Sequence, residues 1–234
     1  MSIWSRIADA LAALTSGQGL TAVFDRFRAS EAPERSVGFT IAVIALGAKM
    51  AKADGEVTRN EVAAFRRIFA IAPDEEANAA RVFNLARQDV AGFDSYARKI
   101  LAMFSRAEAG EQRQLLIDLM EGLFAIAVAD GAYHPGEDDF LAEVSRIFGL
   151  DGPCFTAIKA RHVEGAPRDP YQVLGVEPEA ALAVIRAVWR QAVKDSHPDR
   201  MVARGVPVEA LRLAEQRLIA LNAAWDEISL RRAA

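Results

Sequence analysis

Apolar residues recur at helical spacing along almost the whole chain, and this periodicity limits what it can fold into. Ile185, Val188 and Trp189, for example, follow the i, i+3, i+4 pattern of one buried helix face. Alternating apolar and polar runs bounded by turn residues, which would indicate strands, are nearly absent. We therefore expect an all-α protein.

Composition narrows the class of protein. The 234 residues suffice for two domains, and a hydrophobic fraction of 52% supports packed cores. The net charge of -4 argues against a general nucleic-acid binder, so no nucleic-acid partner is expected. The single cysteine, Cys154, excludes a disulfide framework and a multi-cysteine zinc site. No apolar run reaches the roughly 18–20 residues of a membrane span, so we expect a cytoplasmic protein.

Residues 1–30 are predicted to form an amphipathic arm. Ile3, Trp4 and Ile7 begin an apolar stripe that a Ser-Gly-Gln-Gly breaker at residues 16–19 ends. The polar face is not rich in Lys and Arg, which favours a helix packed on its own domain over an interfacial anchor. Membrane contact at the inner face, without a transmembrane span, stays open as the alternative.

Residues 31–162 are predicted to form a helical bundle with an internal pseudo-duplication. Ala51–Val57 recurs as Ala127–Tyr133, and each copy centres on an Asp-Gly turn. Each turn follows an apolar helix and precedes an amphipathic one. Helix, turn and helix used twice indicate a pseudo-symmetric arrangement.

Each Asp-Gly turn is followed by a glutamate that admits two interpretations. Oxygen ligands suit a hard divalent cation such as Ca²⁺ or Mg²⁺, although the EF-hand pattern is missing. The candidate ligands are Asp54, Glu61, Asp130 and Glu137. Helix capping explains both glutamates without a metal, and Gly55 and Gly131 fit the left-handed residue that ends a helix. Capping is the preferred interpretation, and no other cofactor is expected.

These turns and their glutamates resemble the TerB-like domain, a helical module of tellurite-resistance proteins and of DjlA-type co-chaperones. The resemblance spans about residues 37–160. It implies an all-α, internally duplicated fold, with metal binding at the four carboxylates as an option.

After a linker at residues 163–168, residues 169–234 are predicted to form a separate small unit. Two helices, over about 182–196 and 209–229, each carry a tryptophan on an apolar face, which indicates an antiparallel hairpin. Arg186, Arg190 and Lys194 stand four residues apart and form one basic row. The loop 197–208 between the helices begins with His197-Pro198-Asp199.

This hairpin resembles the J domain of DnaJ-family co-chaperones over Asp169–Ile228. The matching strings, in order, are Tyr171 with Leu174-Gly175-Val176, Ile185-Arg186 with Trp189-Arg190, His197-Pro198-Asp199-Arg200, and Leu218, Leu221-Asn222, Ala224-Trp225 and Ile228. The tripeptide alone would carry little weight, because His134-Pro135 begins a look-alike with Gly136 in the Asp position.

The resemblance implies a partner. J domains dock on a DnaK-type heat-shock chaperone and stimulate its ATP hydrolysis, which traps a client polypeptide. By matching position, Arg186, Arg190, Lys194 and Arg200 would meet an acidic patch on the chaperone, and His197, Pro198 and Asp199 would engage the seam between its ATPase unit and linker. The TerB-like part would recruit a client, a membrane or a regulator. The chain would not itself be an enzyme.

One residue tempers this expectation. Asp195 adds a negative charge among the basic residues, which would weaken or specialise docking. The alternative function is a metal-binding or stress-sensing TerB-like module in which the J-like hairpin is only a scaffold. A hydrolase with His197 as general base is less favoured than either function, because no nucleophile motif accompanies that residue.

Overall fold

The structure, a computed structural model, describes residues 3–12, 22, 24, 32–53, 65, 66, 68–88, 92–105, 107–129, 131–163 and 169–233. All regular elements among these residues are helices, which confirms the all-α prediction. In chain order they are α1 (Ile3–Ala12), α3 (Ala32–Ala53), η1 (Pro73–Glu75), α5 (Glu76–Gln88), α6 (Phe93–Met103), α7 (Ala109–Ala127), α8 (Pro135–Ile147), α9 (Gly152–His162), α10 (Pro170–Leu174), α11 (Leu182–Asp195), α12 (Pro198–Arg204), η2 (Val208–Ala210) and α13 (Arg212–Ala233).

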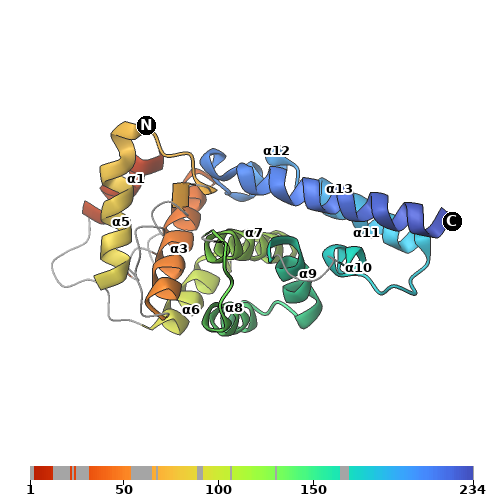
Figure 1. Cartoon of the computed structure of the whole chain (residues 1–234). Coiled ribbons are helices and arrows are strands. Elements are labelled where there is room, and N and C mark those ends of the chain that lie inside the picture. Colours follow the sequence, from red (N-terminus) through yellow and green to blue (C-terminus); the bar gives the residue numbers. More distant parts are fainter. Residues whose placement is uncertain are drawn as a thin grey trace.

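Helix α3 lies at the centre of a helical bundle. Its residues 37–50 are all buried, as expected for a helix that is apolar on every side. Helices α1, α5, α6, α7 and α8 pack around it. In Figure 1, α1 and α5 lie on one side of α3, and α6, α7 and α8 lie on the other. The bundle therefore surrounds α3 with amphipathic helices that turn their apolar faces inward.

Helix α1 belongs to this core. Ile3, Trp4 and Ile7 are buried, and the Trp4 ring meets Phe69 edge to face with 6.2 Å between centroids. The helix packs against α3 and α5. The apolar stripe that the sequence offered for packing or for a membrane surface is therefore occupied by the bundle.

The turn between α7 and α8 follows the capping interpretation. Gly131 has a φ of 89°, a value that favours glycine. Pro135 opens α8, and the Glu137 carboxylate accepts a hydrogen bond from the backbone N–H of His134 at 2.9 Å. Glu137 is thus part of a capping box. Gly55, its counterpart in the first repeat, lies outside the described residues.

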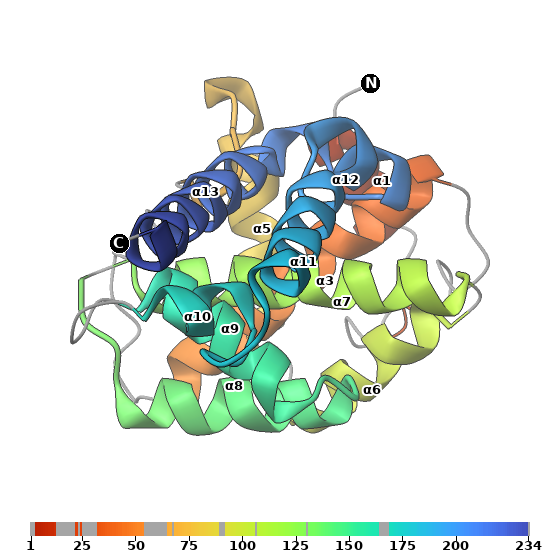
Figure 2. The ribbon, with the colours of Figure 1, turned by 90° about the vertical axis from the view of Figure 1, so that its right-hand side faces the viewer.

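Helices α11 and α13 form the predicted hairpin. Ile185, Leu221 and Ile228 are buried between them and α10. The rings of Trp189 and Trp225 stack with 5.0 Å between centroids. Figure 2 shows α11 and α13 side by side, and α10 packs against both.

The prediction of an irregular loop over residues 197–208 was wrong in part, because α12 occupies residues 198–204. Local signals explain this helix. His197 caps its N-terminus, Pro198 stands at the first helical position, and Gly205 ends it with a φ of 111°. The second long helix also begins later than predicted, at Arg212, after the short turn η2.

The segment that joins α11 to α13, together with the start of α13, packs into the core of the bundle, whereas α10, α11 and the rest of α13 form a second apolar cluster. Met201, Val206, Ala210, Leu213 and Ala214 are buried in the same cluster as the residues of α3 and α7. Helix α12 packs against α3 and α7. Figure 1 shows α13 running from near one end of α3 past α7. Residues from both sides of the predicted domain boundary therefore contribute to one apolar core. Residues 164–168 of the predicted linker lie outside the described residues.

Among the described helices, none combines the length and the apolar character needed to cross a bilayer.

We predict that Met201→Ala destabilises hairpin and bundle together. Met201 is fully buried, so the truncation is expected to lower the free energy of unfolding by about 2–5 kcal/mol. In a Trp4→Phe background the remaining tryptophans, Trp189 and Trp225, report on the hairpin alone. Urea unfolding followed by their fluorescence and by far-UV circular dichroism should give one common midpoint, lowered in both signals. Two separate transitions, with only one affected, would contradict a shared core.

Candidate partner-binding site

The His197-Pro198-Asp199 tripeptide forms the exposed N-terminus of α12. The Nδ1 atom of His197 accepts a hydrogen bond from the backbone N–H of Asp199 at 3.2 Å. An accepting Nδ1 leaves the proton of a neutral imidazole on Nε2. The side chains of His197 and Asp199 are 60% and 92% exposed. The tripeptide is therefore held by its own helix cap while its polar groups face solvent.

Helix α11 leads a basic row toward this tripeptide. Arg186, Arg190 and Lys194 are all exposed. The guanidinium of Arg186 lies 5.4 Å from the centroid of the Trp225 ring, a cation–π contact that orients it. Within the part of the chain that the structure describes, Arg190 and Lys194 form no ion pair, so both keep their charge available for a partner.

Arg200 differs from the other predicted docking cations. Its guanidinium pairs with the Asp195 carboxylate at 3.0 Å. The second oxygen of Asp195 accepts a hydrogen bond from the Gln191 side chain at 2.7 Å. The negative charge expected to weaken docking is thus paired within the chain, and it neutralises Arg200 rather than the row on α11.

Of the four candidate metal ligands, only Glu137 lies among the described residues. Asp54, Glu61 and Asp130 lie outside the described residues. Glu137 is buried and accepts the His134 N–H, as a helix cap requires. Among the described residues no group of three or more His, Cys, Asp or Glu side chains is arranged to hold a metal ion. Divalent-cation binding stays a prediction.

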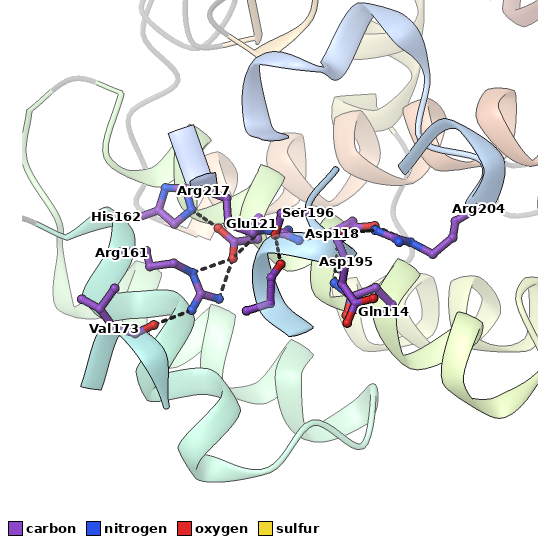
Figure 3. A network of polar contacts seen from close by, with 11 residues as sticks. Gln114, Asp118, Glu121, Arg161, His162, Val173, Asp195, Ser196, Arg204 and Arg217 are labelled. Atoms are coloured by element: carbon purple, nitrogen blue, oxygen red, sulfur yellow. Dashed lines mark hydrogen bonds and ion pairs between the residues drawn. The ribbon is translucent and has the colours of Figure 1, made fainter. Parts of the chain in front are cut away.

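Two buried carboxylates of α7, Asp118 and Glu121, organise the interface between bundle and hairpin (Figure 3). Both are enclosed by cations from other helices. The α7 charge network, as we call it, consists of Asp118, Glu121, Arg161, His162, Arg204 and Arg217. It joins α7 and α9 of the bundle to α12 and α13 of the hairpin.

Asp118 binds one arginine of α12 and one of α13. Its Oδ2 accepts two hydrogen bonds from Arg204 of α12, from Nε at 3.1 Å and from NH2 at 2.8 Å. Its Oδ1 accepts one from NH1 of Arg217 at 2.8 Å. All three side chains are at least nine-tenths buried. Charge-assisted bonds between buried groups are strong and directional, so this carboxylate fixes α12 and α13 on α7.

Glu121 contacts two arginines and a histidine. One oxygen accepts hydrogen bonds from Nε and NH2 of Arg161, at 2.9 and 2.6 Å, and lies 3.2 Å from Nε of Arg217. The other contacts Nε2 of His162. Burial alone would raise the pKa of the Glu121 carboxyl, but Arg161, Arg217 and His162 outweigh it and hold that pKa far below its ordinary value. Glu121 therefore stays ionised throughout the physiological range.

The sequence patterns did not predict this network. The helix before the second Asp-Gly turn was expected to be apolar, and the available signal was two acidic residues one turn apart on its buried face. Their partners could not be identified, because Arg204 and Arg217 lie 86 and 99 residues from Asp118 along the chain.

We predict that Glu121→Gln lowers the free energy of unfolding by about 3–5 kcal/mol at pH 7, because it leaves buried cations unpaired. The pKa of Glu121 is lower in the folded than in the unfolded protein, so its ionised form stabilises the fold. This stabilisation is complete at pH values above the unfolded-state pKa of about 4.3, and it is lost as the pH falls toward the folded-state pKa. The difference between wild type and variant should therefore shrink by roughly 2 kcal/mol at pH 3. Urea unfolding at both pH values measures it.

The matched control is Glu111→Gln, an exposed glutamate in the first turn of the same helix. It should change stability by no more than about 0.5 kcal/mol. Equal losses in the two variants would show that the buried ion pairs at Glu121 contribute nothing special.

Comparisons with known proteins agree with this architecture. The family model described as tellurite resistance protein TerB matches residues 40–160, more than half of the chain. The co-chaperone protein DjlA of Aliivibrio fischeri is 25% identical over 228 residues, covering 83% of this chain and 79% of that protein. DjlA of Coxiella burnetii is 27% identical over 199 residues, covering 76% and 72%. DjlA of Escherichia coli K12 is 22% identical over 266 residues, covering 97% of both.

No solved structure matches the chain at a significant level. The TerB match covers the bundle from α3 to α9, and the alignments with the DjlA proteins extend over most of the chain. The chain therefore belongs to the TerB family and is a DjlA-like protein.

Proposed function

We propose that this chain is a co-chaperone that docks on a DnaK-type heat-shock chaperone and stimulates its ATP hydrolysis. The observation that carries the proposal is the exposed His197-Pro198-Asp199 tripeptide, held as a helix cap at the end of the basic row on α11. The names of the relatives, all co-chaperone proteins, support the same role.

The basic row supplies attraction and orientation. Arg190 and Lys194 are exposed and lie on the helix that leads to the tripeptide. Complementary charge speeds encounter and sets orientation more than it adds affinity. An acidic patch on the chaperone would therefore bring His197 and Asp199 against their contact surface in a defined pose.

The tripeptide acts by conformational bias. Because the cap holds the His197 ring against the backbone N–H of Asp199 before binding, less ordering entropy remains to be lost on contact. A ligand shifts an equilibrium only through its differential affinity for the two states, so the tripeptide must bind the hydrolysis-competent state of the chaperone more tightly. The chain itself performs no bond chemistry in this proposal.

The TerB-type bundle is proposed to recruit a client, a membrane or a regulator. The alignment with DjlA of Escherichia coli K12 covers 97% of this chain, so the similarity to a co-chaperone protein includes the bundle. A cytoplasmic location accords with the single free cysteine, Cys154, since reducing compartments keep thiols unpaired.

We predict that His197→Gln abolishes stimulation of the chaperone while far-UV circular dichroism stays unchanged. The side chain is mostly exposed, so its replacement removes the proposed partner contact and the N-cap of α12 but no core packing. The readout is the steady-state ATPase rate of a DnaK-type chaperone as this protein is added. His134→Gln is the matched control: it alters the look-alike His-Pro at the start of α8 and should leave stimulation intact. A wild-type chain without effect on the ATPase rate would refute the proposed function.

We predict that Arg190→Glu raises the concentration needed for half-maximal stimulation by about tenfold at low salt, because it reverses one charge of the basic row. The difference from wild type should shrink as ionic strength rises, since salt screens exposed charges. The same reversal at Arg98, exposed on α6 away from the hairpin, serves as control and should have little effect. Equal effects of both reversals would point to net charge instead of a specific docking row.

A further inference from the structure

We propose that Asp118 of α7, acting through Arg204, is a positioning residue that holds the His197-Pro198-Asp199 tripeptide in the orientation that the chaperone binds. The inference rests on the proposed function and adds to it a role for the TerB-type bundle. The bundle does not merely accompany the hairpin; it sets the place of the tripeptide.

Arg204 is the last residue of α12, the helix that begins with the tripeptide. Its NH2 group donates a hydrogen bond to the backbone carbonyl of Asp195 at 2.9 Å. Asp195 is the last residue of α11. The tripeptide lies between these two points in sequence, so one guanidinium ties the end of α11 to the end of α12.

Asp118 in turn orients this guanidinium. Nε and NH2 of Arg204 both bond to Oδ2 of Asp118, and the pair is almost fully buried, at 8% and 0% side-chain exposure. Apolar contacts such as those of Met201 are non-directional and would tolerate rotation of α12 about its axis. Charge-assisted bonds from the planar guanidinium fix that rotation.

The same carboxylate also holds α13. Oδ1 of Asp118 accepts the hydrogen bond from Arg217, so one side chain holds both α12 and α13 on α7. Helix α7 packs on α3, the centre of the bundle. The position of His197 and Asp199 is thus set by a residue of the TerB domain that touches neither of them.

The test begins with Arg204→Lys, which keeps the positive charge but lacks the planar fork that joins Asp118 to the Asp195 carbonyl. If the tripeptide then occupies the binding orientation about one tenth of the time, the concentration for half-maximal stimulation rises about tenfold while the rate at saturation is kept. Amide hydrogen exchange of residues 198–206 should accelerate, with α7 and α13 unchanged. Arg231→Lys, an exposed arginine near the end of α13, should match wild type in both measurements.

Asp118→Asn completes a double-mutant cycle. If Asp118 acts through Arg204, the concentration for half-maximal stimulation should be no higher for the double variant than for whichever single variant needs the higher concentration. Effects that multiply would overturn the inference, as would an Arg204→Lys variant within twofold of wild type in half-maximal concentration and exchange. Faster exchange spread equally over α7 and α13 would also overturn it, since Arg204 would then be a general stabiliser. A wild-type chain that fails to stimulate the ATPase would instead overturn the proposed function.

Discussion

The carboxylates of Asp118 and Glu121 are the constraint on which the arrangement of this protein depends. They lie inside a helix that packs in the core, where an unpaired charge is very costly. They can remain there only if cations reach them, and those cations come from α9, α12 and α13. Buried ion pairs often add little net stability over apolar packing. Their contribution here is geometric, because each pair accepts only one arrangement of the helices.

That geometry explains how a small hairpin can hold the proposed binding surface in a fixed orientation. The apolar side of α12 and the start of α13 enter the bundle core, while the outer side carries the capped tripeptide. The basic row of α11 faces away from the network and keeps Arg190 and Lys194 free of internal partners among the described residues. The apolar side chains, the buried charges and the exposed charges therefore lie on different faces of one structural unit. A change on the exposed face leaves the packing and the buried ion pairs in place.

Local sequence patterns predicted the features that depend on neighbours in the chain. Helical spacing indicated an all-α fold and the paired faces of Trp189 and Trp225, and the Asp-Gly turn indicated the conformation of Gly131. The same patterns missed α12, although His197, Pro198 and Gly205 carried its start and stop signals. They also missed the α7 charge network and the shared core, because spacing within a helix says nothing about partners many residues away.

Amide hydrogen exchange of the full chain, with and without a DnaK-type chaperone in its ATP state, tests the central claim most directly. Binding through the proposed surface should slow exchange in residues 186–206, over the basic row and the capped tripeptide. Exchange in α3, α5 and α6 of the bundle should stay unchanged. Protection confined to those bundle helices, or no protection anywhere, would contradict the account.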